Sequence, residues 1–230
     1  MKKALKTLDR GAAFAYAGQR WIALEHDPEG RTLCLAEDIT ELRAFDEGNC
    51  NDWSKSTSRT YLNGPYLDTL IDKAGSSEAF DEVDVDLTTD DGLKDYGTCK
   101  AIIFLLNVDQ YRRNRDVIPN ASDWWWLGTA FSTAANGYEH SARLVYSDGS
   151  LNNHLACYGS HGLRPACYLD SDLLISIEEA DVDAETAGEI VRDLIEGFGS
   201  SFATEEQFKA AAAFMLGTLR AAREQEVAHE

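Results

Sequence analysis

Three imidazoles and two thiols lie within one stretch of the sequence, and these are the side chains that bind zinc. They are His140, His154, Cys157, His161 and Cys167. Neutral imidazole and thiolate hold structural zinc when four ligands meet at characteristic spacings. The spacings here fit no zinc finger or zinc ribbon, and a hydrogen-bonded or exposed histidine is the commoner role. We therefore predict no bound metal and no cofactor.

A carboxylate-rich segment upstream offers the hard oxygen ligands that calcium prefers. Its members are Asp81, Glu82, Asp84, Asp86, Asp90 and Asp91. An EF-hand loop starting at Asp84 needs a glycine at its sixth position and a glutamate at its twelfth. Those positions hold Thr89 and Asp95, so the sequence predicts a solvated acidic loop.

The motifs of the common nucleophilic enzymes are missing. There is no GxSxG, no SxxK and no catalytic-cysteine signature, and the glycines are scattered rather than gathered into a phosphate-binding loop. We therefore predict that the protein is not an enzyme. A thiol or metal enzyme that uses Cys157 or Cys167 remains an alternative.

Aromatic, amide and imidazole side chains are concentrated between residues 124 and 161. Tyrosine provides contact area at low cost in conformational entropy, and amides form adaptable hydrogen bonds, so such residues favour a binding surface. We predict a surface for a protein or glycan ligand, in loops between residues 128 and 161. Its predicted residues are Tyr138, Arg143, Tyr146, Asn152, Asn153, His154, Tyr158 and His161. Trp124 and Trp126 alternate along a strand and are expected to face the core.

Strands must position most of these residues. Turn chemistry and alternation predict strands at 14–16, 21–25, 31–36, 79–87, 101–106, 124–127, 141–146 and 162–169. Ser147-Asp148-Gly149 is a hairpin-turn signal, and residues 128–137 and 151–160 are expected to be irregular. Ser54 or Ser56 caps a short helix, Asn63-Gly64-Pro65 ends it, and another helix begins at Tyr66.

Helical periodicity dominates after Ile177. Apolar residues recur at helical spacing in 187–198 and again in 208–219, which predicts a hairpin of two helices with one apolar side. We therefore predict two domains, 1–177 and a helical tail at 178–230. The apolar side of the tail requires a cover, so a homo-oligomer formed through these helices is a further hypothesis, and a purely structural assembly protein is an alternative function.

The bulk composition narrows the classes of partner. A net charge of −19 leaves little clustered positive charge for nucleic-acid phosphates or anionic membranes, so neither partner is expected. No apolar run is long enough to span a bilayer, and the basic start at Met1 lacks the apolar core of a secretory signal. Five cysteines without CxxC spacing favour reduced thiols. A cytoplasmic or virion-associated location is expected.

Several short motifs, taken in their order along the chain, resemble those of a known domain family. Trp125-Trp126-Leu127-Gly128, then Ala142 to Gly149, then Gly162-Leu163-Arg164-Pro165-Ala166 resemble a bacterial and phage domain family of unknown function. Trp53 to Asn63 and Ile103 to Leu106 also fit, so the likeness covers most of residues 10–175. The family has an arginine where this chain has Gly128, which puts a salt bridge at that position in doubt.

That family is similar to the C-type-lectin-like fold of formylglycine-generating enzymes and phage variable proteins. The resemblance implies an α+β fold: a twisted antiparallel sheet with two flanking helices and long loops, here with the helical hairpin added. It implies a non-catalytic binding or display module of phage or prophage origin. Gly162, Arg164 and Pro165 would be scaffold residues, with Arg164 in a buried ion pair.

Overall fold

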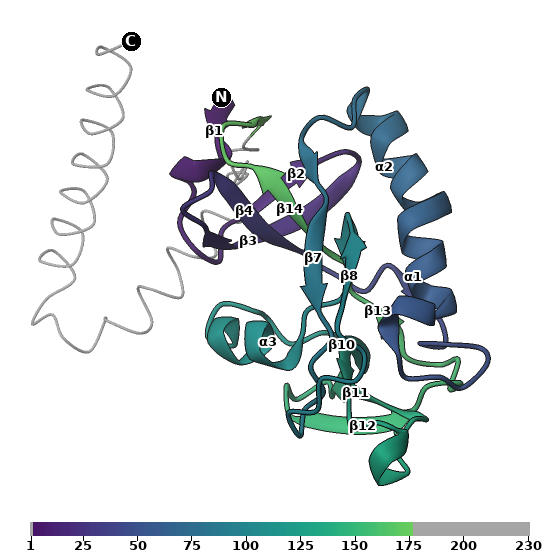
Figure 1. Ribbon diagram of the computed structural model, residues 1–230. Coiled ribbons are helices and arrows are strands. Elements are labelled where there is room, and N and C mark those ends of the chain that lie inside the picture. The colour runs from purple at the N-terminus through teal and green to yellow at the C-terminus, as the bar shows by residue number, and fades with distance from the viewer. Residues whose placement is uncertain (1, 177–230) are drawn as a thin grey trace, which may run out of the picture. The chain divides into compact units, whose positions relative to one another are not determined.

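The structure is a computed structural model that describes residues 2–176 of the chain. The fold of these residues is built mainly from β-strands. Figure 1 shows the arrangement. The strands are β1 (Lys2–Ala4), β2 (Ala13–Tyr16), β3 (Gln19–His26), β4 (Arg31–Ala36), β5 (Glu41–Leu42), β6 (Phe80–Asp81), β7 (Val83–Asp86), β8 (Thr98–Ala101), β9 (Ile103–Phe104), β10 (Trp125–Ala130), β11 (Ser141–Val145), β12 (Leu151–Leu155), β13 (Gly162–Leu163), β14 (Ala166–Asp170) and β15 (Leu174–Ser176). The helical segments are η1 (Leu5–Thr7), η2 (Trp53–Lys55), α1 (Thr57–Tyr61), η3 (Leu62–Tyr66), α2 (Leu67–Ala74), α3 (Val108–Asn114) and η4 (Ala134–Asn136).

The strands form an eight-stranded, a five-stranded and a two-stranded sheet. The eight-stranded sheet has the order β1-β15-β2-β3-β4-β14-β6, with β9 also paired to β14. The predicted meander is confirmed, because β2, β3 and β4 are consecutive antiparallel neighbours. Thr32 to Ala36 are all buried, which is typical of a strand that is covered on both faces.

The five-stranded sheet has the order β12-β11-β10-β13-β5. The β11–β12 hairpin turns where the Ser-Asp-Gly signal predicted, and its five residue pairs run without a register shift. The prediction that residues 151–160 are irregular is therefore wrong for the first five of them. Polar residues can form a strand when a neighbouring strand provides backbone hydrogen-bond partners, because this pairing outweighs their weak β-propensity.

One kinked helical stretch replaces the two separate helices that the sequence predicted. Ser56 caps α1 by accepting the N–H of Arg59, as predicted. Gly64 leaves helical geometry and Pro65 lacks an N–H, yet η3 carries the chain on into α2. Asn63 holds the bend, since its amide donates to Ile103 O at 2.7 Å and its oxygen accepts from Ile102 N–H at 2.9 Å.

The expected C-type-lectin-like fold is wrong for the described residues. Strands in three sheets dominate them, and their one long helical stretch runs from Thr57 to Ala74, as α1 and α2 in Figure 1 show. Two flanking helices around a single twisted sheet are not the arrangement found. The predicted helical hairpin, 178–230, lies outside the described residues. None of the described helices is long and apolar enough to cross a membrane.

Arg164 connects the two large sheets. It lies between β13 of the five-stranded sheet and β14 of the eight-stranded sheet, and its side chain is fully buried. The guanidinium donates to Ala36 O at 2.9 Å, Glu37 O at 2.7 Å and Pro119 O at 3.0 Å. Its scaffold role agrees with the expectation, but its hydrogen-bond partners are backbone carbonyls rather than a paired carboxylate.

Gly128 occupies a point of close backbone approach in β10. Its N–H donates to Leu106 O at 2.9 Å, and a Cβ at this position would lie 2.9 Å from Leu105 O. The arginine that the resembling family carries here has no room in this fold. The pairing of β10 with β11 also shifts between Trp126 and Ala130, so the strand is irregular around this glycine.

Replacing Arg164 with methionine should lower the free energy of unfolding by roughly 3 kcal/mol or more, because three buried carbonyls lose their donor. Urea unfolding followed by tryptophan fluorescence measures this loss. Arg112→Met is the matched control: its guanidinium is half exposed, and the loss there should stay under about 1 kcal/mol. Equal losses in the two variants would contradict the role given to Arg164.

Replacing Gly128 with alanine should cost about 1–3 kcal/mol, since the new methyl group must displace backbone that is already hydrogen-bonded. Gly159→Ala is the control, because no atom lies within 4 Å of the Cβ position there. The control should change stability by less than about 0.5 kcal/mol. A tolerated Gly128→Ala would show that β10 can move away from Leu105.

Candidate functional site

The β11–β12 hairpin sorts the predicted ligand residues by the face of the sheet. Ala142 pairs with His154 and Leu144 with Asn152, while Arg143 pairs with Asn153. Directly opposed residues point to the same face, and neighbours along a strand point to opposite faces. His154 and Asn152 therefore share the face of Leu144, and Arg143 and Asn153 lie on the other face.

The turn after β12 places His161 over that first face. Its ring stacks on Trp124 at 5.3 Å and on Tyr158 at 5.1 Å between centroids. The rings of Trp126 and His154 meet it nearly at right angles, at 4.9 Å and 5.0 Å. Tyr146 extends the cluster by packing on Trp124 at 4.1 Å. We call Trp124, Tyr146, His154, Tyr158 and His161 the histidine–aromatic surface.

The histidine–aromatic surface has a buried floor and an exposed rim. His161 is 3% exposed, whereas Tyr158 is 49% exposed. Two buried nitrogens, His161 Nε2 and His154 Nδ1, have no hydrogen-bond partner. A buried polar atom without a partner costs about 1–3 kcal/mol, so such atoms are uncommon and call for an explanation.

Backbone hydrogen bonds fix the position of His161. Its carbonyl accepts the N–H of Arg43 at 2.9 Å, and the N–H of Gly162 donates to Trp124 O at 2.7 Å. The neighbouring Asn152 amide donates to the Tyr146 hydroxyl, and its oxygen accepts the N–H of Asn153 at 2.8 Å. The surface is therefore held in place by strands on either side of it.

Burial lowers the pKa of His161, and the nearby His154 lowers it further, although Asp123 acts in the opposite direction. The ring is consequently neutral at pH 7, with one nitrogen able to donate a hydrogen bond and the other able to accept one. A neutral imidazole between aromatic rings suits hydrogen bonding to a ligand and does not suit binding an anion.

Three predicted ligand residues lie away from this surface. Arg143, on the opposite face with Asn153, is 3.4 Å from the carboxylate of Asp90. Tyr138 is half exposed and packs on Phe131 at 5.1 Å, in the segment before β11. The structure thus brings together Tyr146, Asn152, His154, Tyr158 and His161, and it separates Tyr138, Arg143 and Asn153 from them.

Sequence reasoning missed the role of Trp124. It was expected to be buried together with Trp126, but of the three consecutive tryptophans the two buried ones are Trp125 and Trp126, at 1% and 0% exposure. Both faces of β10 are covered, since Trp125 contacts Tyr111 of α3 and Trp126 contacts Phe45. Alternation therefore could not separate core from surface, and the sequence placed Trp124 inside the predicted strand 124–127, whereas β10 begins at Trp125.

The cysteines and the other histidine do not join this site. Cys167 is fully buried opposite Cys34 in the eight-stranded sheet, and burial raises the pKa of its thiol. The Nδ1 of His140 lies 2.7 Å from Asn49 O. Cys157 is an exposed free thiol. Within residues 2–176, no three side chains of His, Cys, Asp or Glu are grouped so that they could hold a metal ion.

The acidic loop is tied to the segment before β11. The carboxylate of Asp91 accepts hydrogen bonds from the Ser132 hydroxyl at 2.6 Å and the Asn136 amide at 3.0 Å. These bonds, together with one from Thr89, lower the pKa of Asp91 to about 2. Asp95 accepts the Thr133 hydroxyl at 2.7 Å. The loop therefore also has a structural role beyond the solvated one that the sequence predicted.

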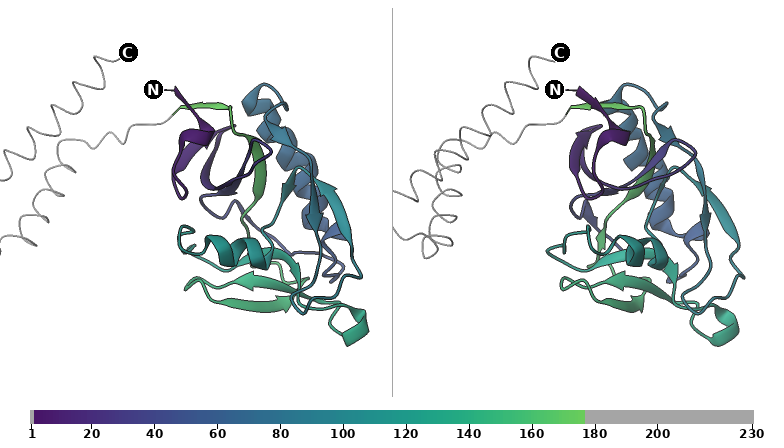
Figure 2. Two further views of the ribbon diagram at one scale, coloured as in Figure 1. Left: turned by 60° about the vertical axis from the view of Figure 1, so that its left-hand side comes forward. Right: turned by 90° about the vertical axis from the view of Figure 1, so that its left-hand side faces the viewer.

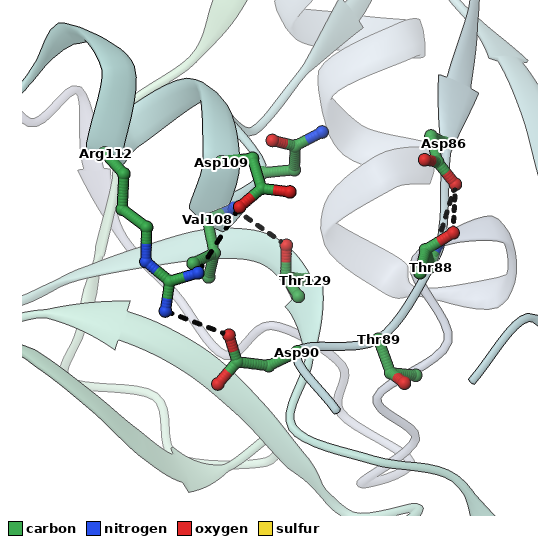
Figure 3. Close-up of a pocket in the computed structure, with 9 residues that line it drawn as sticks. Asp86, Thr88, Thr89, Asp90, Val108, Asp109, Arg112 and Thr129 are labelled. Atoms are coloured by element: carbon green, nitrogen blue, oxygen red, sulfur yellow. Dashed lines mark hydrogen bonds and ion pairs between the residues drawn. The ribbon is translucent and has the colours of Figure 1, made fainter. Parts of the chain in front are cut away.

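A small polar cavity of about 90 Å³ lies beside α3 (Figure 3). Asp90 is 3.4 Å from Arg112, and Arg112 is 3.3 Å from Asp109. The Thr129 hydroxyl accepts the N–H of Val108 at 3.0 Å. Because these lining groups bind one another, we interpret the cavity as part of the packing of α3 on the sheet.

Comparison with known proteins places one region of the chain in a family. The model of a domain of unknown function, DUF6273, matches residues 81–171. This region is a DUF6273 domain. Neither the curated proteins nor the solved structures contain a match to the chain. The resemblance to a domain family of unknown function is confirmed in this form, but nothing links the DUF6273 domain to C-type-lectin-like proteins or to phages. The domain contains the whole histidine–aromatic surface.

The buried histidine should make the fold sensitive to mild acid. Since the pKa of His161 is lowered in the folded chain, the unfolded chain binds a proton first as the pH falls below about 6.5. The free energy of unfolding should therefore fall between pH 7.5 and pH 5.5, as measured by urea unfolding at each pH. His161→Phe keeps the ring stacking and should flatten this dependence.

His140→Gln provides the control, because His140 is exposed and lies outside the surface. It should keep the pH dependence of the unsubstituted chain. A His161→Phe variant as sensitive to acid as that chain would show that another group causes the effect.

Proposed function

We propose that the chain is a non-catalytic recognition module that binds its ligand on the histidine–aromatic surface. The observation that carries the proposal is His161: it is almost fully buried among aromatic rings, yet its Nε2 has no partner. Because that atom is itself buried, a ligand group can hydrogen-bond to it only once the stacked Tyr158 ring moves aside, and the bond would then remove the cost of the unpaired nitrogen. The half-exposed ring of Tyr158 supplies apolar contact area at the entrance.

The composition of the surface supports a protein ligand over a glycan. Tyrosine, tryptophan and histidine rings with a flanking amide are typical of surfaces that recognise proteins, because rigid rings lose little entropy on binding. Asp123 and Asp148 are exposed next to Trp124 and after Tyr146, and the chain carries a net charge of −19. A neutral or basic segment of a partner protein therefore fits best, and a glycan is the alternative ligand.

The alternative of a thiol or metal enzyme that uses Cys157 or Cys167 stays a prediction from the sequence, and Cys157 is an exposed free thiol. Cys167 is enclosed in the eight-stranded sheet and its thiol pKa is raised by burial, which opposes formation of a thiolate. The hypothesis of a structural assembly protein depends on residues 178–230, which lie outside the described part of the chain. It remains a prediction from the sequence.

Replacing Tyr158 with alanine should abolish ligand binding while changing the free energy of unfolding by less than about 1 kcal/mol, since half of the ring is already in water. Tyr138→Ala is the control: Tyr138 is 50% exposed, close to the 49% of Tyr158, its ring packs on Phe131, and it lies outside the surface. The measurement is enrichment of a random peptide library on the immobilised full chain, with affinities of the enriched peptides determined by calorimetry.

Peptides that bind the unsubstituted chain and Tyr138→Ala, but not Tyr158→Ala, are the expected result. A glycan array probed with the same three proteins tests the alternative ligand. The proposal fails if neither library yields a ligand that distinguishes Tyr158→Ala from Tyr138→Ala.

A further inference from the structure

Among the described strands, β12 forms one edge of the five-stranded sheet. It comes last in the strand order, and Figures 1 and 2 show it at the outer margin, with no other described strand beyond it. Its five residues pair with β11 in unbroken register. The opposite edge, β5, has only two residues.

The outward backbone groups of β12 can be assigned from two hydrogen bonds. Ala156 N–H donates to His140 O at 2.8 Å, and Ser150 O accepts Tyr146 N–H at 2.9 Å. Backbone groups alternate in direction along a strand, so those of Asn152 and His154 also point to β11. The groups of Leu151, Asn153 and Leu155 therefore point away from the sheet. Of these, the N–H of Asn153 donates to the Asn152 side-chain oxygen at 2.8 Å, and the carbonyl of Leu155 already accepts the N–H of Tyr158 at 3.0 Å and keeps its second lone pair for a partner strand.

This edge lacks the features that usually prevent strands from pairing. Natural edge strands carry lysine, proline, a bulge or an inward charge. The sequence of β12 is Leu-Asn-Asn-His-Leu, with no proline and no charged side chain, since His154 is not a permanent cation. In a chain of net charge −19, an uncharged edge is a place where a second copy can approach without close like-charge contacts.

The sequence of β12 also reads nearly the same in both directions around Asn153. We propose that two copies of the chain pair antiparallel through β12, on a two-fold axis at Asn153. In that register Leu151 lies opposite Leu155 of the second copy, and Asn152 lies opposite His154 of the second copy. A two-fold interface requires such a self-complementary edge.

The pairing satisfies groups that the single chain leaves unpaired. Leu155 is 48% exposed and gains an apolar neighbour in the leucine that faces it. His154 Nδ1 is buried and has no partner in one chain. The amide of the opposing Asn152 can donate to it once the His154 ring turns outward and that amide leaves the Tyr146 hydroxyl. The leucine contact forms on the face of Asn153, whereas the Asn152–His154 contact forms beside the histidine–aromatic surface, so the two such surfaces of the dimer lie on one face of a continuous sheet.

Five residues give a small interface, so the dimer is expected to be weak and to form toward millimolar protein. Salt should strengthen it, because screening reduces repulsion between two chains of net charge −19. This dependence is opposite to that of an acidic surface binding a basic peptide. Sedimentation equilibrium of the full chain at about 0.05 M and 0.5 M NaCl measures the dimer affinity and shows whether salt raises or lowers it.

Asn153→Asp is the decisive variant. Within one chain the new carboxylate lies beside Arg143, across the β11–β12 pair, which favours the fold. Across the two-fold axis it faces its own copy, and two like charges directly opposed should weaken the dimer by roughly fivefold or more. Asn153 points away from the histidine–aromatic surface, so ligand binding by that surface is expected to survive. Leu42→Asp adds the same charge at the other edge and should leave the dimer unchanged.

Mixing Asn153→Asp with Asn153→Lys should restore association, because opposite charges then face each other on the axis. Dimers that survive Asn153→Asp, or a chain that stays monomeric at millimolar concentration in high salt, would overturn the proposal. Loss of the dimer in Leu42→Asp instead would assign the interface to β5 and would also overturn it.

Discussion

The guanidinium of Arg164 is the constraint on which the two-sheet arrangement depends. It accounts for three hydrogen bonds to the carbonyls of Ala36, Glu37 and Pro119, and it also lies over the Trp125 ring at 5.2 Å. Burial lowers its pKa to about 10, so it stays charged at neutral pH despite its enclosure. A buried cation is stable only when hydrogen-bond acceptors surround it. The acceptors of Arg164 come from the end of β4 and from the segment before β10, so its hydrogen bonds hold both segments against the β13–β14 junction.

The β13–β14 junction also holds the histidine–aromatic surface in place. His161 directly precedes β13, and Arg164 directly follows it, so the imidazole is placed by the same few residues that join the sheets. A surface that is ordered before its ligand arrives loses little entropy on binding. The unpaired nitrogens of His154 and His161 are tolerated because the strands around them hold the rings in place.

The DUF6273 domain cannot be separated from the strands that precede it. Its last strand, β14, lies between β4, which is outside the matched residues, and β6, at their start. Cys34 and Cys167 are register partners across that boundary and both are fully buried. The core of the eight-stranded sheet therefore requires residues on both sides of residue 81, and the matched region supplies the surface while the earlier meander supplies much of its support.

From local chemistry the sequence predicted the β2–β4 meander, the Ser56 cap and the Ser-Asp-Gly hairpin turn, whereas the scaffold role of Arg164 was implied by the family resemblance. It could not show that Asn152 and His154 lie in a strand, because polar residues have no apolar alternation to mark their period. It also could not separate Arg143 from Tyr146, or Tyr138 from Tyr158, as these residue types favour recognition equally. Only the tertiary structure decided which of them meet, because the register of β12 on β11 sets the face on which each side chain lies.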